Sequence, residues 1–85
     1  MYEVEYSPLA EREIRKLPVH ISTQIRQAVD HLVEDPRPRN CRKLKVSGEY
    51  RIRLGKYRVS YKIDDGAKKV LVTSAGLREH FYDQR

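Results

Sequence analysis

The 85-residue sequence contains only one cysteine and no tryptophan. The single cysteine, Cys41, cannot form an internal disulfide and is too little for a zinc site. The sequence also lacks an apolar run of membrane-spanning length, and Met1 is not followed by the basic and then apolar segments of a signal peptide. We therefore expect a reduced, cytoplasmic protein that does not enter a membrane.

Several residue patterns that define enzyme classes are missing as well. The sequence has no cluster of histidines and carboxylates with metal-ligand spacing, no glycine-rich phosphate loop and no nucleophile–His–acid set. Its 39% hydrophobic residues suffice for one small core and leave no room for a deep cofactor pocket. We expect a single domain, residues 1–85, that uses no metal and no cofactor.

Positive charge is abundant but unevenly placed along the chain. The net charge is +6. Residues 1–40 hold six Lys or Arg against seven Asp or Glu, whereas residues 41–85 hold twelve against five, a local charge of +7. Such a concentration of positive charge favours nucleic acid or an acidic protein as the partner.

The stretch Tyr50–Ile63, YRIRLGKYRVSYKI, alternates apolar and polar residues. This period predicts two strands joined by a two-residue turn at Gly55 and Lys56, with glycine in the first turn position of type II′. Because strand side chains alternate between faces, the apolar residues share one face. The other face carries Arg51, Arg53, Arg58, Ser60 and Lys62.

In this hairpin the register would place Arg53 opposite Arg58 and Arg51 opposite Ser60. Like charges directly opposite each other destabilise a sheet. The pairing is tolerated most readily when an anion lies between the guanidinium groups, and the planar fork of arginine fits phosphate oxygens. The alternative is a solvated sheet face on which arginine serves solubility.

The remaining pattern predicts a strand, two helices and further strands. Ser7 and Pro8 have the residue types of a helix N-cap and first position, and Pro18 ends that first helix. The run RKLKV is expected to form a strand with Leu44 inward and Lys43 and Lys45 outward. The expected elements are strand 2–6, helix 8–17, helix 22–34, strands 42–46, 50–54 and 57–63, and a strand over 68–75 that is buried on both faces or nearly so.

This order predicts an α+β fold, β-α-α-β-β-β(-β), with a small antiparallel or mixed sheet and two N-terminal helices packed on one face. The hairpin arginines would lie on the other face. The last strand should pair antiparallel with residues 57–63, so that its C-terminal end lies near Arg58. The tail residues Arg78, His80 and Tyr82 would then gather beside that arginine; for an arbitrary tail the alternative is a frayed polar terminus.

Four segments of the sequence together form a recognisable pattern: SPLAEREIRKLP, DPRP, KLKVSGEYRIRLGKYRVSYKI and GLREHFY. With them, nearly the whole chain resembles the RelE branch of the RelE/ParE superfamily of bacterial toxins, which are the toxic halves of type II toxin–antitoxin pairs. The resemblance implies an endoribonuclease that cuts mRNA in the ribosomal A site and thereby inhibits translation. It implies binding to mRNA and ribosomal RNA, and a toxin–antitoxin hetero-oligomer with an acidic, RelB-like antitoxin. The family's site residues fall on Arg51, Arg53, Arg58, Arg78 and Tyr82.

The sequence departs from the family pattern at three places. The best-known members have lysine where Arg51 and Arg53 stand, many have a basic residue where Leu77 stands, and the longer C-terminal helix of some members is absent. The first departure matters chemically because a guanidinium stays protonated and cannot accept a proton as a lysine amine can.

RNA supplies its own nucleophile, the 2′-OH next to the scissile phosphate, so cleavage needs alignment and charge stabilisation. We expect Arg53 and Arg58 to hold the phosphoryl oxygens and Arg51 to hold the same or a neighbouring phosphate. Arg78 would approach the leaving 5′ oxygen. Tyr82 would stack on a base or orient the 2′-OH, and His80 titrates close enough to neutrality to act as acid or base. Lys43, Lys45 and Lys56 are expected to contact RNA.

Two other functions stay open at this point. One is a ParE-type toxin, which binds DNA gyrase and lacks the catalytic set, whereas this sequence retains Arg58, Arg78 and Tyr82. The other is a non-catalytic RNA-binding module whose arginines follow a nucleic-acid backbone. An acidic, partly disordered antitoxin peptide is also expected on electrostatic grounds, because it would cover the arginines or the apolar parts of the helices.

Overall fold

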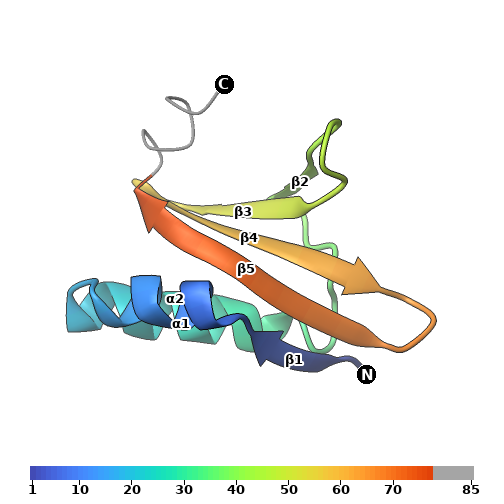
Figure 1. Ribbon diagram of the computed structural model, residues 1–85, viewed down its shortest axis with the longest axis horizontal. Helices are drawn as coiled ribbons and strands as arrows, with labels where there is room; N and C mark the ends of the chain where they lie inside the picture. The colour runs from blue at the N-terminus through green and yellow to red at the C-terminus, as the bar shows by residue number, and fades with distance from the viewer. Residues whose placement is uncertain (78–85) are drawn as a thin grey trace.

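The computed structural model describes residues 1–77 and confirms the predicted α+β fold. The elements are β1 (Glu3–Tyr6), α1 (Pro8–Arg15), α2 (Val19–His31), β2 (Cys41–Lys43), β3 (Tyr50–Leu54), β4 (Tyr57–Asp64) and β5 (Lys69–Leu77). They form one five-stranded mixed sheet in the order β1-β5-β4-β3-β2, in which β1 is parallel to β5 and the other neighbours are antiparallel. Both helices lie on the same side of this sheet (Figure 1).

The helix starts follow from local chemistry. The Ser7 hydroxyl accepts the Ala10 N–H at 3.0 Å, so Ser7 caps α1 as predicted, with Pro8 in the first turn. The second helix begins at Val19 rather than at the predicted Ser22, because the Pro18 carbonyl already accepts the N–H groups of Ile21 and Ser22, both at 2.9 Å. It ends at His31 rather than at residue 34, since the next residues turn tightly with hydrogen bonds to carbonyls three positions back.

The core lies between the helices and one face of the sheet. The helices contribute apolar side chains at helical spacing, and the strands contribute every second residue. Tyr61 is the largest side chain that is fully buried, and its hydroxyl donates to the Pro36 carbonyl at 2.8 Å. The buried hydrophobic residues are Ala10, Ile14, Ile25, Val29, Leu32, Ile52, Val59, Tyr61, Val70, Val72 and Ala75.

Two strand predictions were wrong in detail. The strand expected over residues 42–46 spans only Cys41–Lys43, because the Leu44 N–H donates to the Glu49 carbonyl at 2.7 Å and the Gly48 N–H donates back to the Leu44 carbonyl at 2.9 Å. These bonds close a tight connection between β2 and β3. The last strand is not buried on both faces, since Leu71 is 37% exposed where no helix covers the sheet.

A bulge in β5 sets which of its residues face the hairpin arginines. Ser60 pairs with Ser74 but Tyr61 pairs with Val72, so Thr73 is an extra residue. The Thr73 hydroxyl donates to the Ser60 carbonyl at 3.1 Å, and the Ser7 hydroxyl donates to the Thr73 carbonyl at 3.1 Å. After the bulge, Ala75 pairs with Val59 and is buried in the core.

No helix described within residues 1–77 combines the length and the apolar character required to cross a membrane.

Candidate functional site

The central hairpin has the predicted register. Arg53 is the direct partner of Arg58, and Arg51 is the partner of Ser60. The turn places Gly55 at a positive φ of 62°, a conformation that glycine adopts without steric cost. Two guanidinium groups are therefore fixed opposite each other on the sheet face away from the helices.

A fourth arginine joins these residues from the edge strand β2. Arg42 is the direct partner of Arg51 in the β2–β3 pairing. Sequence reasoning missed Arg42, because a strand over residues 42–46 with Leu44 inward assigns Arg42 to the core face. An alignment of the segment RKLKV as a strand beside the hairpin, with Arg42 opposite Arg51, would have assigned Arg42 to the arginine face, since cross-strand partners share a face.

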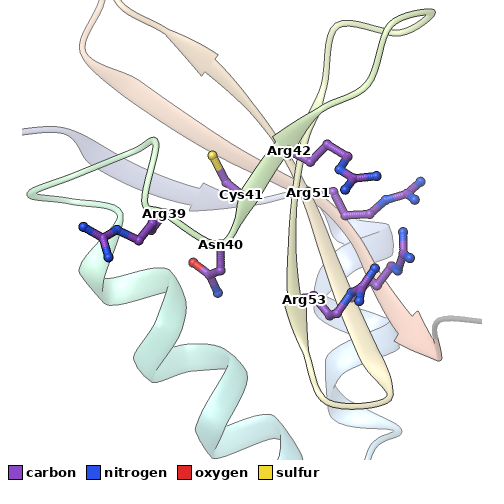
Figure 2. A pocket seen from close by; sticks show the side chains of 7 residues that line it. Arg39, Asn40, Cys41, Arg42, Arg51 and Arg53 are labelled. Atoms are coloured by element: carbon purple, nitrogen blue, oxygen red, sulfur yellow. The ribbon is translucent and has the colours of Figure 1, made fainter.

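These arginines line a pocket of about 360 Å³. Figure 2 shows Arg42, Arg51 and Arg53 projecting to the same side of the strands, whereas Arg39 points away from them. No acidic residue is among the described residues that line the pocket, so its walls carry only positive charge. The lining residues are Arg39, Asn40, Cys41, Arg42, Arg51, Arg53 and Arg58.

The paired arginines differ in their exposure. Arg58 lies on the central strand β4 and is only 6% exposed, whereas Arg53 is exposed. A buried cation interacts more strongly with an anion than an exposed one, because less water screens the pair. Arg58 is thus the anchored member of the pair and Arg53 the accessible one. The alternative of a solvated sheet face, on which arginine serves solubility, does not hold for Arg58, because this residue is buried.

The ion pairs between two residues of the described range, 1–77, lie elsewhere in the fold. Glu11 pairs with Arg15 within α1 and with Arg26 of α2, and Asp65 pairs with Arg37 at 2.9 Å. Within residues 1–77, Arg42 and Arg53 make no hydrogen bond or ion pair. Both guanidinium groups are therefore available to an anion from outside this part of the chain.

A polar clamp fixes the loop that leads into β2. Arg37 donates to both oxygens of Asp65 and to the Tyr50 hydroxyl, and the Tyr2 hydroxyl donates to Asp65 at 2.6 Å. The hydrogen bonds from Arg37 and Tyr2 lower the pKa of Asp65 to about 2. Burial raises the pKa of Tyr61, which holds the same loop through Pro36. The clamp fixes the segment just before Arg42.

The three lysines predicted to contact RNA do not line the pocket. Lys43 lies on the opposite face from Arg42, with its ammonium 5.9 Å from the centre of the Tyr50 ring. Lys45 is exposed in the β2–β3 connection and Lys56 is exposed in the hairpin turn. Their role in RNA binding stays a prediction.

The predicted tail residues Arg78, His80 and Tyr82 lie outside the described residues. The strand that precedes them is described, and its pairing is the one predicted: Gly76 is the partner of Arg58 and Leu77 is the partner of Tyr57. The last described residue therefore ends beside the arginine pair. Within residues 1–77, no group of three or more His, Cys, Asp or Glu side chains is arranged to hold a metal ion.

The two-helix, five-stranded fold is shared with solved toxins of the RelE type. A chain of the toxin–antitoxin complex RelBE2 from Mycobacterium tuberculosis is 29% identical with a TM-score of 0.81, and the match covers 91% of this chain and 98% of that chain. A chain of the archaeal RelE–RelB complex from Pyrococcus horikoshii is 28% identical with a TM-score of 0.81, covering 91% and 94%. The isolated RelE toxin of E. coli is 26% identical with a TM-score of 0.80, covering 99% and 94%.

Residues 4–75 match the family model described as the ParE toxin of type II toxin–antitoxin systems, parDE. No curated protein sequence matches the chain at a significant level. Because the family model spans most of the chain, the protein belongs to the ParE toxin family, within the RelE/ParE superfamily. It is a type II toxin, RelE-like in structure.

Proposed function

We propose that this toxin is an endoribonuclease that cleaves mRNA in the ribosomal A site and inhibits translation. The observation that carries the proposal is the pocket in which Arg42, Arg51, Arg53 and Arg58 meet without an acidic lining residue. Such a pocket is suited to a phosphodiester, whose charge grows during cleavage. The likeness to solved RelE toxins supports the same conclusion.

The chemistry assigned to the pocket is transfer of the phosphate to the neighbouring ribose. The 2′ oxygen loses its proton and bonds to phosphorus, the bond from phosphorus to the 5′ oxygen breaks, and that oxygen takes up a proton. The products are a 2′,3′-cyclic phosphate and a 5′-OH. Arg58 and Arg53 hold the phosphoryl oxygens from two directions and stabilise the extra negative charge.

The two proton transfers need groups other than these arginines, because a guanidinium stays protonated in proteins. We assign them to the tail, with Arg78 at the leaving oxygen and with Tyr82 and His80 as the groups that orient or move protons. A site that consists mostly of fixed positive charge depends on correct placement of its substrate. A ribosome that presents the codon provides that placement.

We further propose an acidic antitoxin as the partner of this chain. The relatives from M. tuberculosis and P. horikoshii were solved as complexes of toxin and antitoxin. An acidic peptide would neutralise the pocket, and helix residues such as Leu9 and Val19, which are 48% and 79% exposed, offer apolar contacts. The toxin and its antitoxin would form a hetero-oligomer in the cytoplasm.

The test is cleavage of mRNA on translating ribosomes. The wild type should cut within codons, and Arg58→Ala should lower the rate on the order of 100-fold, because a positioned donor to developing charge is lost. Lys62→Ala is the matched control, since Lys62 is an exposed cation on the same sheet face that does not line the pocket. Equal rates for Arg58→Ala and Lys62→Ala would overturn the role of the pocket.

The ParE family model favours a second candidate function, inhibition of DNA gyrase. A supercoiling assay with purified gyrase separates the two. Inhibition of supercoiling together with no cleavage on ribosomes would replace the nuclease by the gyrase inhibitor.

A further inference from the structure

The arginine face consists of two cross-strand rows rather than one cluster. Arg42 and Arg51 form one row across β2 and β3. Arg53 and Arg58 form the next row across β3 and β4. The rows are two residues apart along β3, which corresponds to about 7 Å at the rise of a strand.

In each row, two positively charged residues are direct cross-strand partners. Two cations directly opposite each other on a sheet repel, and an anion that lies between them is attracted by both. A phosphate that lies directly between the members of one pair is about 7 Å along the strand from the point between the members of the other pair. The spacing of the rows is comparable with the distance between consecutive phosphates of an extended polynucleotide.

We infer that the two rows bind two consecutive phosphates of single-stranded RNA and that Arg42 is a substrate-binding residue. The row of Arg53 and Arg58 holds the scissile phosphate, and the row of Arg42 and Arg51 holds the adjacent one. The inference rests on the proposed function for the identity of the ligand as RNA. It extends the site to the edge strand, where Arg42 is exposed and makes no hydrogen bond or ion pair within residues 1–77.

The exposed residue Lys62 provides a matched control. Arg42 and Lys62 each carry one positive charge and both are exposed. Lys62 follows Ser60 by two residues in β4, so it lies on the same sheet face as the arginines, but it does not line the pocket. A general electrostatic attraction would be weakened equally by Arg42→Ala and Lys62→Ala, whereas a phosphate contact is lost only with Arg42.

The experiment measures binding of a single-stranded RNA hexamer by fluorescence anisotropy over a series of salt concentrations. All riboses carry 2′-O-methyl groups, so the RNA cannot be cut. Arg42→Ala should weaken binding about tenfold at low salt. It should also reduce the slope of log K against log salt by about 0.7, the value for one phosphate contact on a single strand. Lys62→Ala should change the affinity less than about twofold.

A second measurement identifies the phosphate that Arg42 contacts. Each linkage of the hexamer is replaced in turn by a neutral methylphosphonate, and the wild type is compared with Arg42→Ala on each RNA. At one linkage the difference between the two proteins should disappear, because the contact is already lost. Neutralising the linkage next to it should abolish the corresponding difference for Arg53→Ala.

Three results would overturn the inference: equal effects of Arg42→Ala and Lys62→Ala, a difference between the wild type and Arg42→Ala that persists whichever linkage is neutral, or no salt-dependent binding by the wild type. Thermal unfolding of each variant verifies that the fold is retained. If the binding results are as expected but ribosomal mRNA is not cut, the proposed nuclease fails while the two-phosphate site stands.

Discussion

Arg53 and Arg58 face each other directly across β3 and β4, and Arg53 is exposed whereas Arg58 is only 6% exposed. A pair of like charges at such a position opposes folding. The turn at Gly55 and the apolar residues on the other face fix this register, so the chain cannot slip to relieve the repulsion. The sheet therefore holds two like charges opposite each other at the place where the proposed substrate binds.

Reversing the charge at Arg53 should stabilise the fold and abolish cleavage. Arg53→Glu converts the repulsive cross-strand pair with Arg58 into an attractive one, which should raise the free energy of unfolding by roughly 0.5–1 kcal/mol. The same change places a carboxylate against the scissile phosphate and should reduce mRNA cleavage below detection. Urea unfolding at pH 7 and the ribosomal cleavage assay measure the two effects.

Lys62→Glu is the control for that variant, because it makes the same change in net charge on the same sheet face away from the pocket. It should leave the cleavage rate within about twofold of the wild type. A destabilised Arg53→Glu protein would contradict the argument that the arginine pair opposes folding.

The hydroxyl of Tyr61 should contribute measurably to stability. It donates at 2.8 Å to the carbonyl of Pro36, and both residues are buried. Tyr61→Phe leaves that carbonyl without its donor and should lower the free energy of unfolding by about 1–2 kcal/mol. Tyr57→Phe serves as the control, since the Tyr57 hydroxyl makes no hydrogen bond within residues 1–77 and its loss should cost less than about 0.5 kcal/mol. Equal midpoints for the two variants in urea unfolding would show that the bond to Pro36 adds nothing.

The clamp between Arg37 and Asp65 predicts a loss of stability in acid. The pKa of Asp65 is about 2 in the folded chain, and an unfolded aspartate titrates near 3.9. Because the folded pKa is the lower one, the clamp stabilises the fold fully above about pH 4, and its contribution is lost as the pH falls towards 2. Urea unfolding of the wild type between pH 6 and pH 2 should therefore show a steeper decline than that of Asp65→Asn.

Arg37→Gln provides the corresponding test of the cause. If Arg37 lowers the pKa of Asp65, adding Asp65→Asn to Arg37→Gln should change the acid decline less than it does in the wild type. If Asp65→Asn changes the acid decline as much in the Arg37→Gln protein as in the wild type, a group other than Arg37 lowers the pKa of Asp65.

Sequence periodicity was sufficient to predict the strands and register of the hairpin, because its two faces differ strongly in polarity and its turn is marked by Gly55. It therefore predicted that Arg53 pairs with Arg58. The same reasoning failed at β2, where three paired residues are too few for alternation to show, and the face of Arg42 depends on pairing with a distant strand. The clamp from Arg37 to Asp65 joins residues 28 positions apart, and no local pattern indicates it.

The sequence pattern also did not predict which residues on the second sheet face are buried. The run Val70–Val72 is uniformly apolar, which favours a strand covered on both sides. In the fold both helices pack on one side, so Leu71 remains exposed while its neighbours are buried (Figure 1). Alternation in the hairpin likewise assigned Arg58 to an open face, although its central strand is flanked on both sides and the residue is buried.

Restoring the lysines found in the best-known RelE members should give the toxin a new pH dependence. In the double variant Arg51→Lys/Arg53→Lys, two amines replace guanidinium groups that stay protonated. The neighbouring Arg42 and Arg58 favour the neutral form of each lysine and lower its pKa below the ordinary value near 10.4. Cleavage by the variant should rise between about pH 8 and pH 10 relative to the wild type, because a neutral amine can accept the 2′-OH proton. Single-turnover rates on ribosomes at each pH measure the ratio, and Lys56→Arg in the exposed turn is the control with an unchanged profile. A constant ratio of variant to wild type across this range would mean that neither lysine takes part in proton transfer.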